Sequence, residues 1–160
     1  MMENQLFQIV EKAEISNLLF NYFRAIDEKQ LDKEIVENTF TSDAKVIKPN
    51  GAISVGPHEI LEGQLKSFLR FKATQHVCTD FIIEIANDSA SIRTNLSAMH
   101  VWGLINENPS LEGKHFHAGG VLTTKAIKVE GHWRISEWIF RNTWRSGDGL
   151  NEMAKFARPS

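Results

Sequence analysis

Four long β-rich runs make up the second half of the chain, and they limit the possible folds more than any other feature. Asn-Asp-Ser follows the first run, and Glu-Gly precedes the last. Strands joined by such tight turns pair antiparallel. The sequence therefore predicts a curved antiparallel sheet with four long strands: TQHVCTDFIIEIA, SASIRTNLSAMHVWGLI, HFHAGGVLTTKAIKV and HWRISEWIFRNTW.

The first half of the chain is typical of helices. Apolar residues recur at helical spacing over residues 4–27, 31–40 and 57–70, and the segment AKVIKPNGAISVGP between the last two reads as a short hairpin. Helices followed by a strand meander indicate an α+β fold with the helices on one face of the sheet. A length of 160 residues predicts one domain over residues 1–160.

The helix expected over residues 4–27 carries an acid on its apolar side. Winding it at about 100° per residue places Asp27 near Phe20 and Phe23 and away from the polar stripe. A carboxylate among aromatic rings needs a charged or hydrogen-bonding partner. We therefore expect Asp27 to point inward, on a broad buried face that also includes Leu6, Ile9, Val10, Ala13, Leu18, Leu19, Tyr22 and Ile26.

Composition excludes several classes of partner. The formal charge of −2 provides no basic field for nucleic acid or an anionic membrane, and no apolar run approaches the roughly 20 residues of a membrane span. Cys78 is the only cysteine, so no internal disulfide forms, and the N-terminus lacks the pattern of a signal peptide. We expect a cytoplasmic protein, and small-molecule or protein partners remain.

His76 is the residue best placed to meet Asp27. It opens the first long strand in the phrase TQH, where a strand facing the helices reaches the end of the first helix. An imidazole in contact with a carboxylate becomes a base whose tautomer the acid fixes. Spacing alone leaves an alternative open, in which His76 is exposed to solvent and Asp27 caps the next helix.

Other residues allow two interpretations each. His100, on the neighbouring strand, reaches the same cavity or is a core histidine. His115 and His117 share a strand face, as metal ligands do, but without a third ligand at a typical spacing we expect no metal. Arg141 is either a pocket cation or an edge residue, and Cys78 reads as a small packing residue.

Four phrases stand out together with the order of elements: LLFNYFRAIDEKQLDKEIVENTFTSDAKV, GPHEI, ATQHVCTDFIIEIANDSASI and EGHWRISEW. Over about residues 5–145, they resemble the SnoaL-like branch of the nuclear transport factor 2-like superfamily. The resemblance implies a cone-shaped sheet with three N-terminal helices on its concave face. It also implies a homodimer or homotrimer, and a scaffold that serves enzymes and binding proteins alike.

The closest catalytic pattern is similar to that of the scytalone dehydratase-like enzymes. Their acid–histidine pair corresponds to Asp27 and His76, and their second active-site histidine corresponds to His100. Three groups of the pattern differ, because its two tyrosines fall at Ile26 and near Lys48, and its asparagine falls around Gly120. The base is therefore kept while the electrophilic groups differ.

These observations predict a lyase or isomerase, dehydratase-like, that needs no cofactor. His76 would take a proton from a small, mostly apolar cyclic substrate, Asp27 would orient the imidazole, and His100 would assist. We expect Lys48, Arg141, Tyr22 and Phe23 to bind the substrate. The alternative is a non-catalytic protein that uses the same cone to hold a small molecule.

Overall fold

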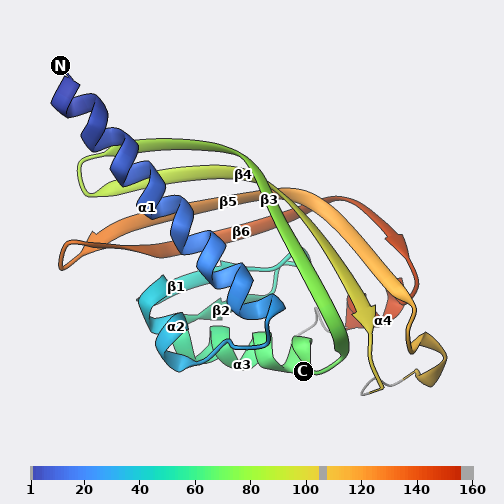
Figure 1. Cartoon of the computed structure of the whole chain (residues 1–160). Helices are drawn as coiled ribbons and strands as arrows, with labels where there is room; N and C mark the ends of the chain where they lie inside the picture. Colours follow the sequence, from blue (N-terminus) through green and yellow to red (C-terminus); the bar gives the residue numbers. More distant parts are fainter. Residues whose placement is uncertain (1, 105–107, 156–160) are drawn as a thin grey trace.

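The computed structural model describes residues 2–104 and 108–155. A long helix and two shorter ones occupy the first half, and four long strands occupy the second (Figure 1). The elements are α1 (Met2–Asp27), α2 (Lys33–Thr39), β1 (Phe40–Ile47), β2 (Ile53–Val55), α3 (Gly56–Phe68), β3 (Phe71–Ala86), β4 (Ser89–Trp102), the 3₁₀ turn η1 (Pro109–Leu111), β5 (His115–Val129), β6 (His132–Gly147) and α4 (Leu150–Lys155). The expected α+β class is confirmed. The sequence also predicts a short closing helix over residues 150–156, and α4 is found there as far as Lys155, while Phe156 lies outside the described residues.

The six strands of the described residues form one curved, open sheet in the order β2-β1-β6-β5-β4-β3. The four long strands pair antiparallel with their neighbours in sequence, as expected. One pair corrects the expectation of a purely antiparallel sheet, because β1 runs parallel to β6, with Val46 opposite Trp138. This pairing is non-local, so no turn in the sequence signals it. The sheet is therefore mixed.

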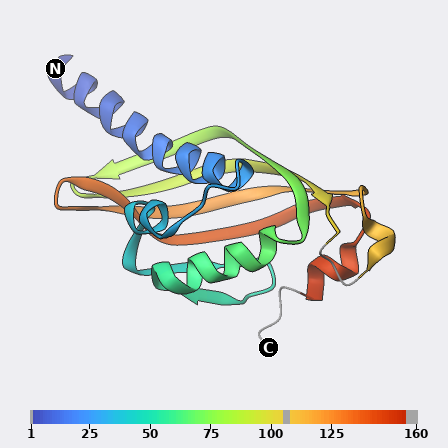
Figure 2. The ribbon, with the colours of Figure 1, turned by 60° about the horizontal axis from the view of Figure 1, so that its bottom comes forward.

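The main core lies between the helices and the inner face of the sheet (Figures 1 and 2). Local signals set the helix ends that build it. Asp32 caps α2 by accepting a hydrogen bond from the Ile35 N–H at 2.9 Å, and Pro57 occupies the first turn of α3. The buried side chains come from α1, α2, β1, α3 and three long strands, and include Leu19, Tyr22, Ile26, Val36, Phe40, Ile60, Leu96, Leu122, Ile135 and Trp138.

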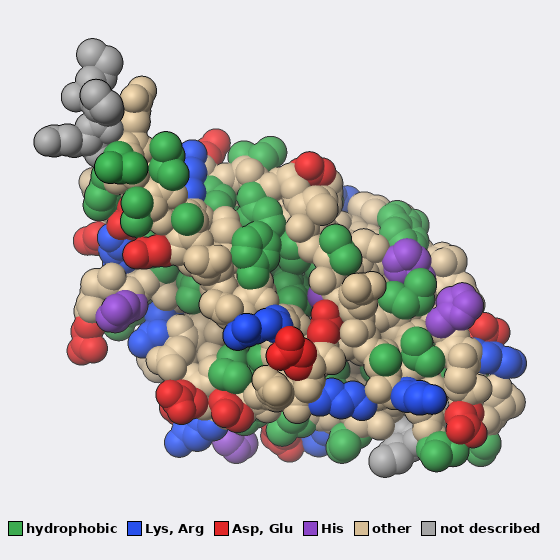
Figure 3. Space-filling view, viewed as in Figure 1, with side chains coloured by type: hydrophobic (Ala, Val, Ile, Leu, Met, Phe, Trp, Pro, Cys, Tyr) green, Lys and Arg blue, Asp and Glu red, His purple; other side chains and the backbone are tan. Residues whose placement is uncertain are grey.

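The first turns of α1 extend beyond the sheet and do not join the core. Leu6, Ile9 and Val10 are 62%, 65% and 46% exposed, so the expectation of a buried face over the whole helix is wrong for this end. Hydrophobic side chains gather on this part of the surface in Figure 3. Periodicity reports which side of a helix is apolar, but the length of the sheet beneath it decides how many turns are covered.

A buried ion pair attaches the middle of α1 to the sheet. Glu11 is only 6% exposed and accepts hydrogen bonds from the Trp133 indole N–H and the Lys128 ammonium, each at 2.7 Å. These donors belong to β6 and β5, on either side of the turn that joins the two strands. The contact therefore fixes the point at which α1 leaves the sheet.

Glu11→Gln is expected to lower the free energy of unfolding by about 1–3 kcal/mol, because the Lys128 charge then stays buried without its counter-charge. Urea denaturation monitored by circular dichroism measures the change. Glu14→Gln makes the same substitution at an exposed position of the same helix and should stay close to the wild type. Equal losses for both variants would contradict a specific role of the Glu11 contact.

Candidate active site

The end of α1 places Asp27 against the start of β3. Lys29 takes a left-handed conformation with φ of 56°, and the Gln30 N–H donates to the Ala25 carbonyl at 2.8 Å, which closes the helix just after Asp27. The Lys29 ammonium then donates to the Phe71 carbonyl at 3.0 Å. Because β3 begins at Phe71, this contact ties the helix end to the strand that carries the histidine.

Asp27 accepts three hydrogen bonds from β3. The Thr74 hydroxyl donates at 2.8 Å, the His76 backbone N–H at 2.7 Å, and His76 Nδ1 lies 2.7 Å from Asp27 Oδ1. Thr74 and His76 are two residues apart and so share a strand face. A carboxylate only accepts hydrogen bonds, so the proton of the neutral imidazole belongs on Nδ1 and Nε2 is left as the basic nitrogen.

The hydrogen bonds keep Asp27 ionised. Partial burial raises the pKa of Asp27, but the hydrogen bonds and charge of His76, together with the Thr74 hydroxyl, outweigh it and hold the pKa below its ordinary value. The other open interpretation of Asp27, as the cap of the next helix, does not hold, because Asp32 caps α2. Asp27 instead contacts His76.

His76 faces a cavity of about 340 Å³ between the helices and the sheet. Phe23 stacks on its imidazole, with ring centroids 4.9 Å apart and planes inclined by 19°. This contact and the Asp27 contact fix the ring on two sides. The wall of the cavity is mostly apolar, and its hydrophobic members are Phe23, Ile26, Val46, Ile47, Pro49, Leu96, Ala98, Phe116, Ala118, Trp138, Phe140 and Met153.

His100 lines the same cavity from β4. Its ring lies 5.8 Å from the His76 ring and is buried between Phe71 and Phe116. Burial, followed by the positive charge of a protonated His76, lowers the pKa of His100 to about 4. His100 is therefore neutral at pH 7 and acts there as a hydrogen-bonding group without charge.

The four expected substrate-binding residues occupy different positions. Phe23 and Lys48 line the cavity. Tyr22 does not, because it is buried behind Trp138, whose ring it meets edge-on at 5.6 Å, and burial raises the pKa of its phenol. Arg141 is exposed, lies opposite Val121 in the sheet and is not among the described residues that line the cavity.

Sequence reasoning missed several polar residues of the cavity. Arg70 precedes β3, and Asn142 and Arg145 come from the end of β6. The active-site asparagine of the similar enzymes falls around Gly120 in this sequence. The residue paired with Gly120 on β6 is Asn142, and Asn142 lines the cavity. A β-bulge between Gly119 and Gly120 separates Asn142 from Arg145, so strict alternation along β6 does not reveal both.

The remaining candidate residues lie elsewhere. His115 is exposed, and His117 Nε2 lies 2.9 Å from the Ser97 hydroxyl oxygen, under the Trp144 ring. Among residues 2–104 and 108–155, no group of three or more histidine, cysteine or acidic side chains could hold a metal ion. Burial, followed by the negative charge of Asp27, raises the pKa of the Cys78 thiol to about 12, so this thiol is not a nucleophile at neutral pH.

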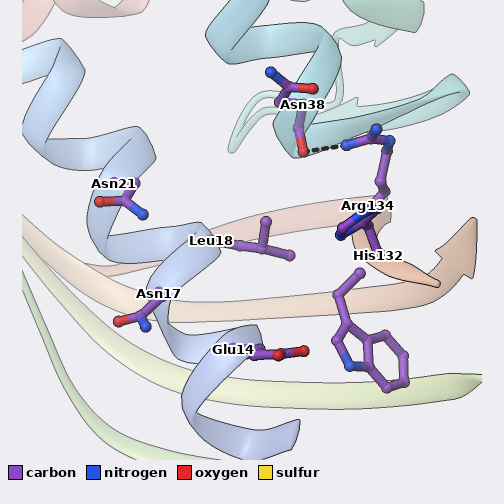
Figure 4. A pocket seen from close by; sticks show the side chains of 8 residues that line it. Glu14, Asn17, Leu18, Asn21, Asn38, His132 and Arg134 are labelled. Carbon is purple, nitrogen blue, oxygen red and sulfur yellow. Dashed lines mark hydrogen bonds between the residues drawn. The ribbon is translucent and has the colours of Figure 1, made fainter.

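A second depression lies outside the cone, where α1 passes the turn between β5 and β6 (Figure 4). Its polar lining includes Asn17, Asn21 and His132, and Arg134 donates to the Asn38 carbonyl at 2.6 Å. No described pair of residues there resembles the contact between Asp27 and His76. Of the two depressions, the cone is thus the one whose described lining includes an imidazole in contact with a carboxylate.

The chain is similar to known proteins in sequence and in fold. The family of SnoaL-like domains matches residues 8–139, which include Asp27, His76 and His100. No curated protein matches the sequence significantly. In the part of the chain that the structure describes, no helix has the length and apolar character needed to cross a membrane.

Solved structures share the fold at low sequence identity. A candidate scytalone dehydratase from Novosphingobium aromaticivorans superposes with a TM-score of 0.76 at 20% identity, over 94% of this chain and 93% of its own. A protein from Kribbella flavida gives 0.78 at 20% identity, over 95% and 99%. A hexachlorocyclohexane dehydrochlorinase, LinA type 3, from Novosphingobium barchaimii gives 0.75 at 15% identity, over 91% and 95%.

Proposed function

The chain belongs to the family of SnoaL-like domains, and from this premise we propose that it is a dehydratase-like lyase or isomerase that works without a cofactor. The observation that carries the proposal is the 2.7 Å contact between His76 Nδ1 and Asp27 Oδ1 at the wall of a mostly apolar cavity. The substrate is a small, mostly apolar cyclic molecule with a C–H bond acidified by a carbonyl or a leaving group.

His76 is the general base of the proposed reaction. Its Nε2 takes the proton from carbon, and the electron pair of the broken C–H bond forms a new double bond. In an elimination the leaving group departs with its own electron pair, whereas in an isomerisation the proton returns at another carbon. A positioned general base typically contributes 10²–10⁴-fold to the rate.

Asp27 and His100 have supporting roles in this proposal. Asp27 holds Nδ1–H and stabilises the imidazolium as it forms, which favours proton transfer. His100 is neutral at pH 7 and its ring donates to the Phe116 backbone, so it takes part without charge and not as an imidazolium acid. Lys48 and Asn142 line the same cavity and supply hydrogen-bond donors to negative charge on the substrate.

Solvent-deuterium exchange tests the proposal before the natural substrate is identified. We expect the protein to accelerate exchange at the acidic C–H positions of a cyclic ketone such as 2-tetralone in D₂O, followed by proton NMR. His76→Gln should return the rate to that of a protein-free control. If the protein accelerates exchange for none of a panel of monocyclic and bicyclic ketones, the chain is better described as a binding protein.

A further inference from the structure

A row of inward-facing residues crosses the four long strands and begins at His76. In the strand registers, Ala98 lies opposite His76, and Ala118 lies opposite Ala98. Arg145 lies opposite Ala118, because the β-bulge adds one residue to β6. All four residues line the cavity. Since neighbouring strands lie about 4.8 Å apart, the row spans roughly 14 Å along the sheet from β3 to β6.

Ala98 and Ala118 occupy the middle of this row. Apart from one glycine of α3, they have the smallest side chains among the described residues that line the cavity. Larger residues border them on β4 and β5, with Leu96 two residues to one side and the paired His100 and Phe116 two residues to the other. Ala98 and Ala118 therefore form an alanine floor between higher walls.

A second pair of alanines on the same two strands has a different environment. Ala90 and Ala126 also lie opposite each other, but they belong to a buried cluster that includes Ile15 of α1, and Ala126 is 0% exposed. Strands usually carry larger β-branched or aromatic residues, so each alanine pair leaves space above the sheet. At Ala90 and Ala126 that space holds side chains of the core, whereas above the alanine floor it is part of the cavity.

The end of the row away from His76 is polar. When the Asn142 amide is oriented with its oxygen toward Arg145, that oxygen accepts hydrogen bonds from Arg145 Nε at 2.7 Å and Nη2 at 2.9 Å. This contact holds the guanidinium beside Asn142, and both residues line the cavity. A molecule that reaches from His76 to this polar end must therefore fit over the alanine floor.

We propose that Ala98 and Ala118 determine the size of the substrate. A ring system of about two fused rings, which the span of the row accommodates, lies over them with its acidic C–H bond at His76 and its far end beside Arg145. The role of His76 in this statement rests on the proposed function, whereas the size limit set by the alanine floor does not. A larger side chain at either alanine would occupy the space that the ring needs, and a single added carbon in a pocket changes discrimination by about 10- to 200-fold.

Valine substitutions test the alanine floor through affinity and stability together. Ala98→Val and Ala118→Val should each weaken the binding of 2-tetralone about tenfold or more, because the added methyl groups occupy the space of the ring. Titration followed by ligand-observed NMR measures this affinity. The urea midpoint of both variants should stay at or above that of the wild type, because valine favours strands and the methyl groups enter a cavity.

Ala126→Val is the matched control. It makes the same substitution on β5 against packed neighbours, so its urea midpoint should fall while its affinity for 2-tetralone stays that of the wild type. Unchanged affinity in either Ala98→Val or Ala118→Val would overturn the proposal, as would a fall of their midpoints as large as that of Ala126→Val. Failure of the wild type to bind 2-tetralone at millimolar concentration would overturn it too.

His76→Gln separates this inference from the proposed function. The variant should still bind 2-tetralone while losing deuterium exchange. If both valine variants weaken binding but His76→Gln keeps exchange, the alanine floor stands and proton abstraction by His76 fails. If His76→Gln loses exchange but the valine variants bind 2-tetralone as the wild type does, the proposed function stands and the alanine floor fails.

Discussion

His76→Gln is expected to lower kcat/KM by about 10²–10⁴-fold for any substrate that the wild type converts, because glutamine cannot take up the proton. Asp27→Asn is expected to lower kcat/KM by at least about 10²-fold. The amide removes the charge that stabilises the imidazolium, and its NH₂ group favours the tautomer with the proton on the wrong nitrogen. Steady-state kinetics on a converted ketone or a substrate identified by co-purification measures both effects.

Two matched substitutions serve as controls for these variants. Glu28→Gln changes the exposed acid directly after Asp27, and His115→Gln changes an exposed histidine on the outer face of the sheet. Both should keep wild-type activity, and circular dichroism should show that all four variants are folded. Full activity of folded Asp27→Asn and His76→Gln would exclude the pair as the catalytic groups.

His100 is expected to make the protein lose stability as the pH falls below about 6.5. The unfolded imidazole takes up a proton near its ordinary pKa of 6.5, whereas the folded one does so only near 4. Between these values the unfolded state binds more protons, so the free energy of unfolding rises with pH. Between pH 6.5 and 5 the contribution amounts to about 2 kcal/mol.

His100→Leu removes this titration with a side chain of similar volume. Urea denaturation at several pH values should show a shallower loss for the variant than for the wild type between pH 6.5 and 5. The carboxylates do not interfere in this window: Asp27 and Glu11 have lowered pKa values, so their stabilising contributions persist above their ordinary pKa values of 3.8 and 4.5 and are lost only at lower pH. His132→Leu, at an exposed position, is the control. Identical slopes for wild type and His100→Leu would contradict the prediction.

Local signals in the sequence were sufficient for most of the fold. The turns between the long strands, Asp32 at the start of α2 and Pro57 in α3 each act within a few residues. The parallel pairing of β1 with β6 joins segments about ninety residues apart and leaves no local signal. The exposed start of α1 depends on where the sheet ends, which periodicity does not report.

The same distinction between local and long-range signals applies to the candidate site. Spacing made Asp27 and His76 candidates but left their contact open, and it was the resemblance to the scytalone dehydratase-like enzymes that implied the pair, which the structure places 2.7 Å apart. Arg141 and Asn142 could not be distinguished, since the bulge opposite Gly119 and Gly120 changes which residues of β6 face inward. Arg70 lies between α3 and β3, where the sequence has neither helical nor strand periodicity to indicate which way its side chain points.

The position of β3 at the margin of the sheet gives Asp27 a further consequence. Among the strands that the structure describes, β3 pairs only with β4, so the N–H groups on its other side have no described strand to bind. Asp27 accepts one of them, the backbone N–H of His76, and thereby occupies a place that a strand from another molecule would otherwise use. The carboxylate that contacts the His76 ring thus also covers part of the β3 edge against intermolecular β-pairing.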